Sequence, residues 1–265
     1  MKEQTNMSKR SKSVRIFLLV AIPVILFLVA IQYAVLSVVS VRNHLKSVYQ
    51  LDDVKLLSAG SGADTVWFGH YKEKTWLETR FQISRTDSIS LSINLKDSLL
   101  QLELKGVVLK TSKITAFEAD QFFYQLNAGA YHHFFGGQAT GTNALSTIEK
   151  EPLIVKKAPK DSIEFANQKH VVDSLKDEAV HWMLKLDNGI VLKIEGTDEY
   201  TNSEWWQGQQ FWWKQDFLQL KKDLRKTLFF EVPEYQPQIE LVISEADAKA
   251  IYRALPVQPL ICIRM

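Results

Sequence analysis

The side chains that could do chemistry most readily in this sequence are one cysteine and a few histidines. Cys262 is the sole cysteine of the 265-residue chain, and a cysteine attacks as a thiolate, which needs a nearby base or positive charge. It alternates with Ile261 and Ile263 in an apolar run, where cysteine commonly serves as a small hydrophobic residue. A structural role is therefore favoured, and a single cysteine forms no intramolecular disulfide.

The histidines show no spacing that predicts a metal site. His132 and His133 are adjacent, whereas His70, His170 and His181 are scattered. A structural zinc site draws on paired ligands one helical turn apart or in a tight knuckle, and the sequence contains neither. We interpret the histidines as surface or packing residues and predict no metal.

The glycines form no motif for a phosphate or a nucleophile. The patterns Gly-x-x-x-x-Gly-Lys-Ser/Thr and Gly-x-Gly-x-x-Gly, whose backbone amides hold phosphates, are absent from the sequence. A Gly-x-Ser-x-Gly nucleophile elbow is absent too. The sequence therefore predicts no nucleotide cofactor, and we predict no cofactor of any kind.

A cluster of tryptophans is the strongest candidate for a contact surface. It comprises Trp205, Trp206, Trp212 and Trp213. Exposed tryptophans can stack on sugar rings, lie at a membrane interface or anchor a partner. Buried packing is the favoured interpretation, because Trp206, Trp213 and Phe217 fall on one face of a helix, with Trp205 and Trp212 on an adjacent face. All four tryptophans stay candidates for contact with a partner or glycan.

Alternating apolar residues predict the strands that would position these groups. The runs 89–95, 100–104 and 107–114 alternate with polar residues and are separated by turn residues, which indicates an antiparallel meander. Further on, the alternating residues 182–186 and 190–194 predict a hairpin, for which two registers are possible. A three-residue loop with Gly189 in the left-handed conformation pairs Leu184 with Leu192 and keeps apolar residues on one face, so we prefer it to a two-residue Asn-Gly turn.

Helices are predicted after two serines that suit the N-cap position. Ser203 precedes a helix from Glu204 to about Leu228, and Ser244 precedes a short helix over Ala246–Ala254. A strand over Pro259–Met265 follows. We also predict a helix over 162–176, a loop over 56–63, and strand or irregular structure over 65–83. The fold class is therefore α+β.

One apolar segment determines the topology. The stretch 16–41 contains no charged residue and exceeds the roughly 20 residues that cross a bilayer as a helix. We predict a cytoplasmic basic tail over 1–15, a transmembrane helix over 16–41, a juxtamembrane segment over 42–86 that packs on the main domain, and a β-rich extracytoplasmic domain over 87–265. A cleaved signal peptide is the alternative, although its apolar region is usually about 7–15 residues long.

The charge distribution supports this orientation and excludes one class of partner. The chain carries 32 basic and 30 acidic residues, and the tail contributes one acid, Glu3, against the basic residues Lys2, Lys9, Arg10, Lys12 and Arg15. Basic residues stay on the cytoplasmic side of a span. Without the tail's five bases and one acid, 27 basic and 29 acidic residues remain. This part has no basic surplus for binding nucleic acid.

Four segments together resemble parts of a known family. One is the run Ile89-Ser-Leu-Ser-Ile-Asn-Leu-Lys-Asp-Ser-Leu-Leu-Gln-Leu-Glu-Leu-Lys-Gly106, and two others are the predicted helix Ser244–Tyr252 and the predicted strand Pro259–Met265. These three segments are similar to parts of the catalytic domain of L,D-transpeptidases, which cross-link bacterial peptidoglycan. A family strand ends in Ile-His-Gly-Thr, and this chain has Ile194-Glu-Gly-Thr197. The resemblance implies the family's fold.

The resemblance also implies that the family's catalytic residues are missing. It places Glu240 at the position of the family's catalytic cysteine, Gln238 at the preceding histidine and Glu195 at an earlier histidine. The ending Cys262-Ile-Arg-Met265 repeats letters of the family's nucleophile motif, but no His-Gly precedes it. We interpret Glu195, Gln238 and Glu240 as positions of a degenerate site.

These observations predict a membrane-anchored, non-catalytic protein of the cell envelope. Its main domain would lie in the periplasm, outside the inner (cytoplasmic) membrane, and would bind peptidoglycan or another envelope protein. Two alternatives stay open. One is an enzyme acting on the cell wall, either an L,D-transpeptidase using Cys262 or a hydrolase using Glu195 and Glu240, since paired carboxylates can do acid–base work. The other is a subunit of an envelope secretion or motility complex.

Overall fold

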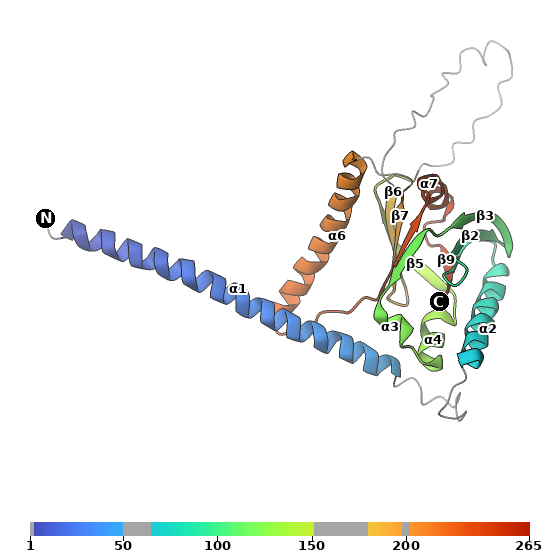
Figure 1. Ribbon diagram of the computed structural model, residues 1–265, viewed down its shortest axis with the longest axis horizontal. Coiled ribbons are helices and arrows are strands. Elements are labelled where there is room, and N and C mark those ends of the chain that lie inside the picture. The colour runs from blue at the N-terminus through green and yellow to red at the C-terminus, as the bar shows by residue number, and fades with distance from the viewer. Residues whose placement is uncertain (1–2, 50–64, 151–179, 198–201) are drawn as a thin grey trace, which may run out of the picture. The chain divides into compact units, whose positions relative to one another are not determined.

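The computed structural model describes residues 3–49, 65–150, 180–197 and 202–265. It shows an α+β protein with a mixed nine-stranded sheet and one long apolar helix near the N-terminus (Figure 1), which confirms the predicted fold class. The helix predicted over 162–176 and the loop predicted over 56–63 lie outside the described residues.

The chain divides into two compact units. The N-terminal unit comprises the described residues of Met1–Val54 and Trp213–Tyr235, and the sheet unit comprises those of Lys55–Trp212 and Gln236–Met265.

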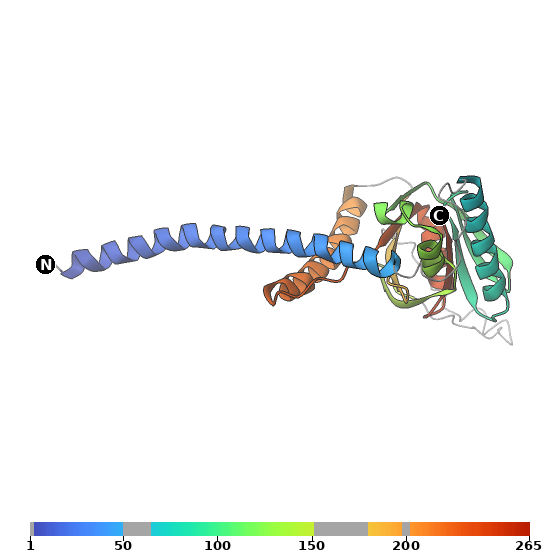
Figure 2. The same cartoon turned by 90° about the horizontal axis from the view of Figure 1, so that it is seen from below.

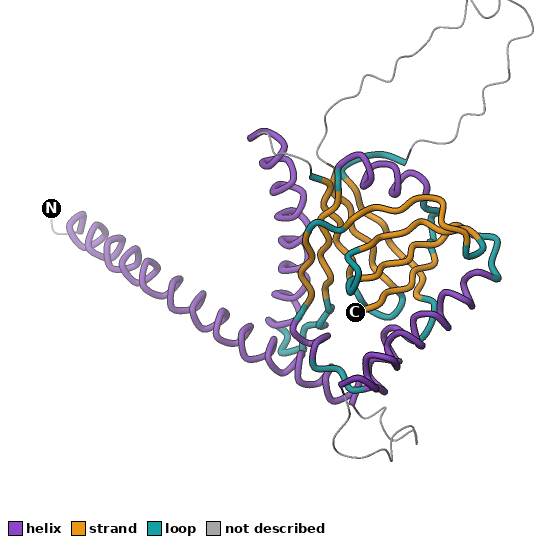
Figure 3. The backbone as a smooth tube through the Cα atoms, turned by 45° about the vertical axis from the view of Figure 1, so that its right-hand side comes forward, coloured by secondary structure: helices purple, strands orange, loops and turns teal. Residues whose placement is uncertain are grey.

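The strands of the sheet unit follow the order β3-β2-β1-β9-β5-β6-β7-β8-β4, and Figure 3 shows them curling round the core. The pairs β1–β9 and β7–β8 are parallel, and the other neighbours are antiparallel. The strands are β1 (Ile89–Asn94), β2 (Leu99–Leu104), β3 (Val107–Lys113), β4 (Ala116–Ala119), β5 (Ala139–Ser146), β6 (Val180–Leu186), β7 (Val191–Gly196), β8 (Gln238–Ile243) and β9 (Leu260–Arg264).

The predicted meander and hairpin are both confirmed. Strands β1, β2 and β3 pair antiparallel in succession. In the β6–β7 hairpin Leu184 pairs with Leu192, and the amide of Leu186 donates to the carbonyl of Ile190 at 2.8 Å. Gly189 has a φ of +87°, the left-handed conformation that the preferred register requires. Apolar residues of both strands consequently face the core.

Both predicted N-terminal helix boundaries are close to the observed ones. The Ser244 side chain accepts a hydrogen bond from the amide of Asp247 and caps α7 (Glu245–Ala254). Helix α6 (Asn202–Leu228) begins one residue before Ser203. The helices of the sheet unit also include α3 (Gln121–Tyr124) and α4 (Ala128–Phe135).

The prediction of strand or irregular structure for 65–83 is wrong. This segment forms α2 (Thr65–Ser84), which contacts β9 and α4 and lies along one side of the sheet unit (Figures 1 and 2). Its aromatic residues favour a strand by propensity, but its buried residues follow a helical period. These are Thr75, Trp76, Thr79 and Ile83. Packing against the sheet therefore overrides local propensity.

A buried ion pair joins α2 to the sheet. The Arg80 guanidinium donates to Glu103 of β2 with 2.6 Å between Nη2 and Oε1, and the Glu103 side chain is almost fully buried. The guanidinium of Arg80 also lies 4.6 Å from the ring centroid of Trp76, and that of Arg264 lies 5.3 Å from the same ring. A buried carboxylate is costly without such a cation.

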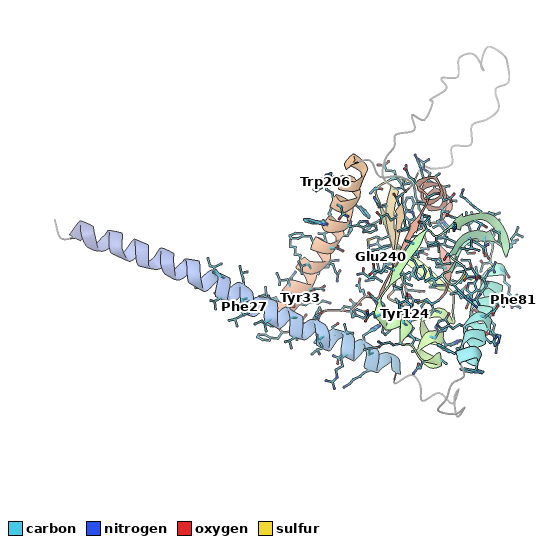
Figure 4. All side chains as sticks on the ribbon, viewed as in Figure 1. Phe27, Tyr33, Phe81, Tyr124, Trp206 and Glu240 are labelled. Atoms are coloured by element: carbon cyan, nitrogen blue, oxygen red, sulfur yellow. The ribbon has the colours of Figure 1, made fainter. Side chains whose placement is uncertain are left out.

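The N-terminal unit contains α1 (Glu3–Tyr49) and the second half of α6. Helix α1 has the length and composition to cross a membrane, a property that it shares with a signal sequence. The large apolar side chains that it exposes are Ile22, Val24, Ile25, Leu26, Phe27, Leu28, Ile31, Val35 and Val38. Phe27 is labelled among the side chains projecting from α1 in Figure 4.

The interior of this unit is polar. The buried residues among those whose side chains are described are Ser40, Asp223, Thr227 and Pro233. The side chain of Gln32 donates to the Thr227 carbonyl at 2.7 Å, and the Ser40 hydroxyl donates to the Pro233 carbonyl at 2.5 Å. The unit thus buries hydrogen-bonded polar groups while the large apolar side chains of α1 are exposed.

The ion pair under α2 gives a test of the fold. We expect Arg80→Met to lower the free energy of unfolding by about 3 kcal/mol, because it leaves Glu103 buried without a cation. Asp87→Asn is the matched control, since it breaks an exposed ion pair with Lys105 and should cost under about 1 kcal/mol. Chemical denaturation of the full chain in detergent would measure both variants, and equal losses would contradict the burial of Glu103.

Candidate functional site

The three predicted degenerate-site positions lie on one face of the sheet. In β8 the half-buried residues Gln238 and Glu240 alternate with buried apolar residues, and Glu195 has the same position in β7. Strands β7 and β8 are parallel neighbours in which Lys193 pairs with Glu240 and Glu195 pairs with Val242. Glu195 and Glu240 are therefore on adjacent strands, one diagonal step apart. We call this surface, with His181 of β6 and Lys193, the polar sheet face.

Each carboxylate of this face has a basic neighbour. Lys193 Nζ lies 2.8 Å from Glu240 Oε1, whereas Glu195 Oε1 lies 4.0 Å from His181 Nδ1. The side chain of Glu195 is 32% exposed and that of Glu240 is 47% exposed, so water reaches both carboxylates. Glu240 is labelled on the sheet in Figure 4.

His181 is the least solvated group of the polar sheet face. Its side chain is 0% exposed, and neither ring nitrogen has a hydrogen-bond partner within the described part of the chain. Burial lowers the pKa of His181, and the charge of Glu195 opposes this shift in part. The sequence suggested a packing role for this histidine, but its pairing with Glu195 was missed. In the alternating strand β6, His181 precedes the core residue Trp182 by one position, so the sequence pattern alone would have placed His181 on the opposite, polar face.

The first half of α6 covers part of the polar sheet face. Gly208 passes so close to His181 that a Cβ at this glycine would lie 2.3 Å from Nε2. Trp212 contacts His181 edge to face, with 5.9 Å between ring centroids, and Lys193 Nζ lies 5.4 Å from the centroid of the Trp212 ring. Sequence reasoning missed Gly208, although a glycine within a helix often marks a close approach. The cover fixes His181 and Lys193 in place.

The tryptophan cluster is oriented differently from the prediction. Trp206 is 61% exposed, Trp213 is 74% exposed and Phe217 is 66% exposed, so these three residues are not core residues. Trp212, predicted for the adjacent face, packs on the sheet. Helical spacing identified which residues share a face, but it could not show which face meets the sheet. The side chain of Trp205 is not among those described.

Cys262 is a poor candidate for a nucleophile. It is 4% exposed and packs with Trp76 and Ile83. Burial raises the pKa of its thiol to about 12, so it is protonated at neutral pH, whereas a reactive cysteine needs the thiolate. Strand β9 also places Cys262 opposite Ser92 of β1, under α2 and away from the polar sheet face. The structural role favoured by the sequence fits this position.

The chemistry available to the polar sheet face is that of two solvated carboxylates beside a lysine and a neutral histidine. Such a pair could serve acid–base catalysis only with a substrate between the carboxylates, so the hydrolase stays a prediction. Among the described residues no group of three or more His, Cys, Asp or Glu side chains could hold a metal ion. Binding through charge and hydrogen bonds is the simpler capacity of this surface.

The buried state of His181 predicts a pH dependence of stability. Because its pKa is lowered in the folded protein, the unfolded chain takes up a proton first as the pH falls below about 6.5. We therefore expect the melting temperature of the full chain to fall between about pH 7 and pH 5. His181→Leu should reduce this fall, whereas His132→Leu, at an exposed position, should not. An unchanged pH profile in the His181 variant would show that His181 does not titrate in this way.

Neither the known protein families, nor the curated proteins, nor the solved structures gave a match to this chain. The resemblance to L,D-transpeptidases therefore stays a prediction.

Proposed function

We propose that this protein is a single-pass membrane protein of the cell envelope, and that it holds a non-catalytic domain on the outer side of the cytoplasmic membrane. The exposed apolar side chains of α1 carry the proposal. Soluble proteins rarely expose a contiguous apolar patch of this kind, and each large apolar side chain moved out of water contributes about 1.5–3 kcal/mol. A lipid environment makes this helix stable.

The orientation follows from the charges at the N-terminal end of α1. Five basic residues and one acid precede the apolar stretch, and such an excess stays in the cytoplasm. The sheet unit would then lie in the periplasm. Its lack of disulfides is no obstacle, because it has an extensive apolar core that includes Leu91, Ile93, Trp182, Leu192, Ile194 and Ile239.

A binding role fits the sheet unit better than catalysis. The one thiol is buried and protonated, and the histidine of the polar sheet face is buried beneath α6. The carboxylates of Glu195 and Glu240 are partly exposed beside His181 and Lys193, so they contribute charge to this surface.

An envelope protein is favoured over peptidoglycan as the partner because of strand β3. This strand ends the sheet and exposes Val107, Val108 and Leu109. An edge strand offers unpaired backbone groups to which another chain can add a strand. Peptidoglycan is the second candidate, with the exposed Trp206 as its contact. A secretion or motility complex is one assembly in which such a protein partner would occur.

The membrane topology can be tested in bacterial cells that express the full chain. We expect the protein to stay in the membrane pellet after alkaline carbonate extraction. Protease added to spheroplasts should remove the sheet unit, because it lies outside the membrane. Intact N-terminal sequence in the mature protein would exclude signal cleavage. A sheet unit that becomes accessible only after the spheroplasts are lysed would reverse the orientation, and a soluble, shortened chain would refute the anchor.

The partner contact can be tested with a photo-crosslinking amino acid at Val108. We expect one discrete adduct of higher mass, because a strand added at β3 would touch this side chain. The same group at Lys96, an exposed turn residue, is the matched control and should give none. A protease-resistant adduct that a muramidase degrades would identify peptidoglycan and contradict a protein partner, as would equal labelling at both positions.

A further inference from the structure

Helix α6 has an apolar face that none of the described side chains of the N-terminal unit covers. Trp213, Phe217, Leu220, Leu224 and Leu228 are all exposed, and their spacing places them within about 80° of one another around the helix axis. We call these five residues the apolar stripe. Phe229 and Phe230, which follow the helix, are exposed as well. A helix that exposes such a stripe to water is unfavourable, so the stripe needs an apolar neighbour.

The face that α6 turns inward is polar. Asp223 and Thr227 are buried, and Gln219 donates from Nε2 to Asp223 Oδ1 at 3.2 Å. The hydroxyl of Thr227 donates to the carbonyl of Asp223 at 2.8 Å. The polar groups are therefore satisfied inside the unit while the apolar groups point outward. This arrangement suits a helix that meets lipid, because lipid supplies no hydrogen bonds.

Contacts between α1 and the end of α6 define how deep the end of α6 lies in the membrane that α1 would span. The predicted segment 16–41 is longer than the about 20 residues that cross a hydrocarbon core of about 30 Å, so with the inner boundary at Ile16 the outer boundary falls near Leu36. Gln32 lies about one turn inside this boundary, whereas Ser40 and His44 lie beyond it.

The partners of these three α1 residues follow one another in the same order along the chain. Gln32 bonds to the carbonyl of Thr227, and Ser40 bonds to that of Pro233. The ring of His44 lies 5.3 Å from that of Tyr235. The end of α6 is therefore level with the outer membrane–water boundary. Tyr33, adjacent to Gln32, is labelled where α6 ends in Figure 4.

Basic residues border the apolar stripe on the side away from α1. Lys214, Lys221, Lys222 and Arg225 are exposed, and the helical period places three of them directly beside the stripe. Interfacial helices combine Trp, Phe and Leu on one face with Lys and Arg on the polar face, which attract anionic headgroups. The charges therefore favour a lipid surface over a purely apolar protein groove.

We propose that residues 213–228 form an interfacial helix whose apolar stripe enters the outer leaflet of the membrane that α1 spans, with Lys214, Lys221 and Arg225 against anionic headgroups. The chain would then hold the membrane at two places, through α1 and through α6. This inference rests on the proposed anchor, because the depth of α6 is set by α1.

The test is lipid quenching of a fluorophore in the full chain reconstituted into vesicles of phosphatidylcholine and phosphatidylglycerol. The environment-sensitive label is attached to a cysteine introduced by Phe217→Cys or Leu224→Cys in the stripe. Lys222→Cys, about 160° from the centre of the stripe, is the matched control. Leu28→Cys in α1 tests the anchor separately. Cys262 is buried, and the wild-type chain treated in parallel corrects for any labelling there.

Lipids carrying a spin-label quencher should dim the labels at residues 217 and 224 several-fold more than the label at residue 222. The label at residue 28 should be quenched as well. Quenching at residue 28 without quenching in the stripe would overturn the interfacial helix and leave the anchor intact. An absence of quenching at residue 28 would refute the anchor itself. A stripe label that reports an apolar environment but escapes the lipid quencher would show that protein covers the stripe, which also overturns the proposal.

Discussion

The side chains of Gln32 and Ser40 make the contacts on which the N-terminal unit depends. Both residues lie in a helix that otherwise exposes apolar groups, and both donate to backbone carbonyls after or near the end of α6. Gln32 lies within the proposed span, where a polar side chain is stable only when its hydrogen bonds are made within the protein, whereas Ser40 lies on the water side of the span's outer boundary. These two bonds therefore hold α6 and its following loop against α1, and they orient the apolar side chains of α6 outward.

The charged groups of the sheet unit differ in how far they are buried. Glu103 is buried and is matched by Arg80, whereas Glu195 and Glu240 are partly solvated beside His181 and Lys193. His181 is buried and neutral beneath Gly208 and Trp212. Here burial selects paired or uncharged groups. The polar sheet face is therefore a fixed electrostatic surface and lacks an activated nucleophile among its described residues.

The fold could be predicted from sequence wherever a period of two had one buried face. The strands of the meander and the pairing of Leu184 with Leu192 followed from alternation, and Ser244 followed from capping chemistry. Residues 65–84 were missed because aromatic propensity hid a helical period of buried positions. The exposure of Trp206 and Trp213 was missed for a different reason: a helical period shows which residues share a face, but the surroundings decide which face is buried. The site was predicted in part, since Glu195, Gln238 and Glu240 do share a sheet face. His181 and Gly208 required the three-dimensional contacts.

The proposed anchor and interfacial helix both require that lipid surrounds the apolar side chains of α1 and the apolar stripe of α6. This requirement is tested most directly by spin labels placed one at a time along residues 21–47 and 213–228 of the full chain in lipid nanodiscs. The measurement compares collisions with oxygen, which concentrates in lipid, and with a water-soluble nickel complex. The account predicts oxygen maxima at residues 24–28, 31 and 35 of α1 and at residues 213, 217, 220, 224 and 228 of α6. Maxima of nickel accessibility at those same positions would contradict it.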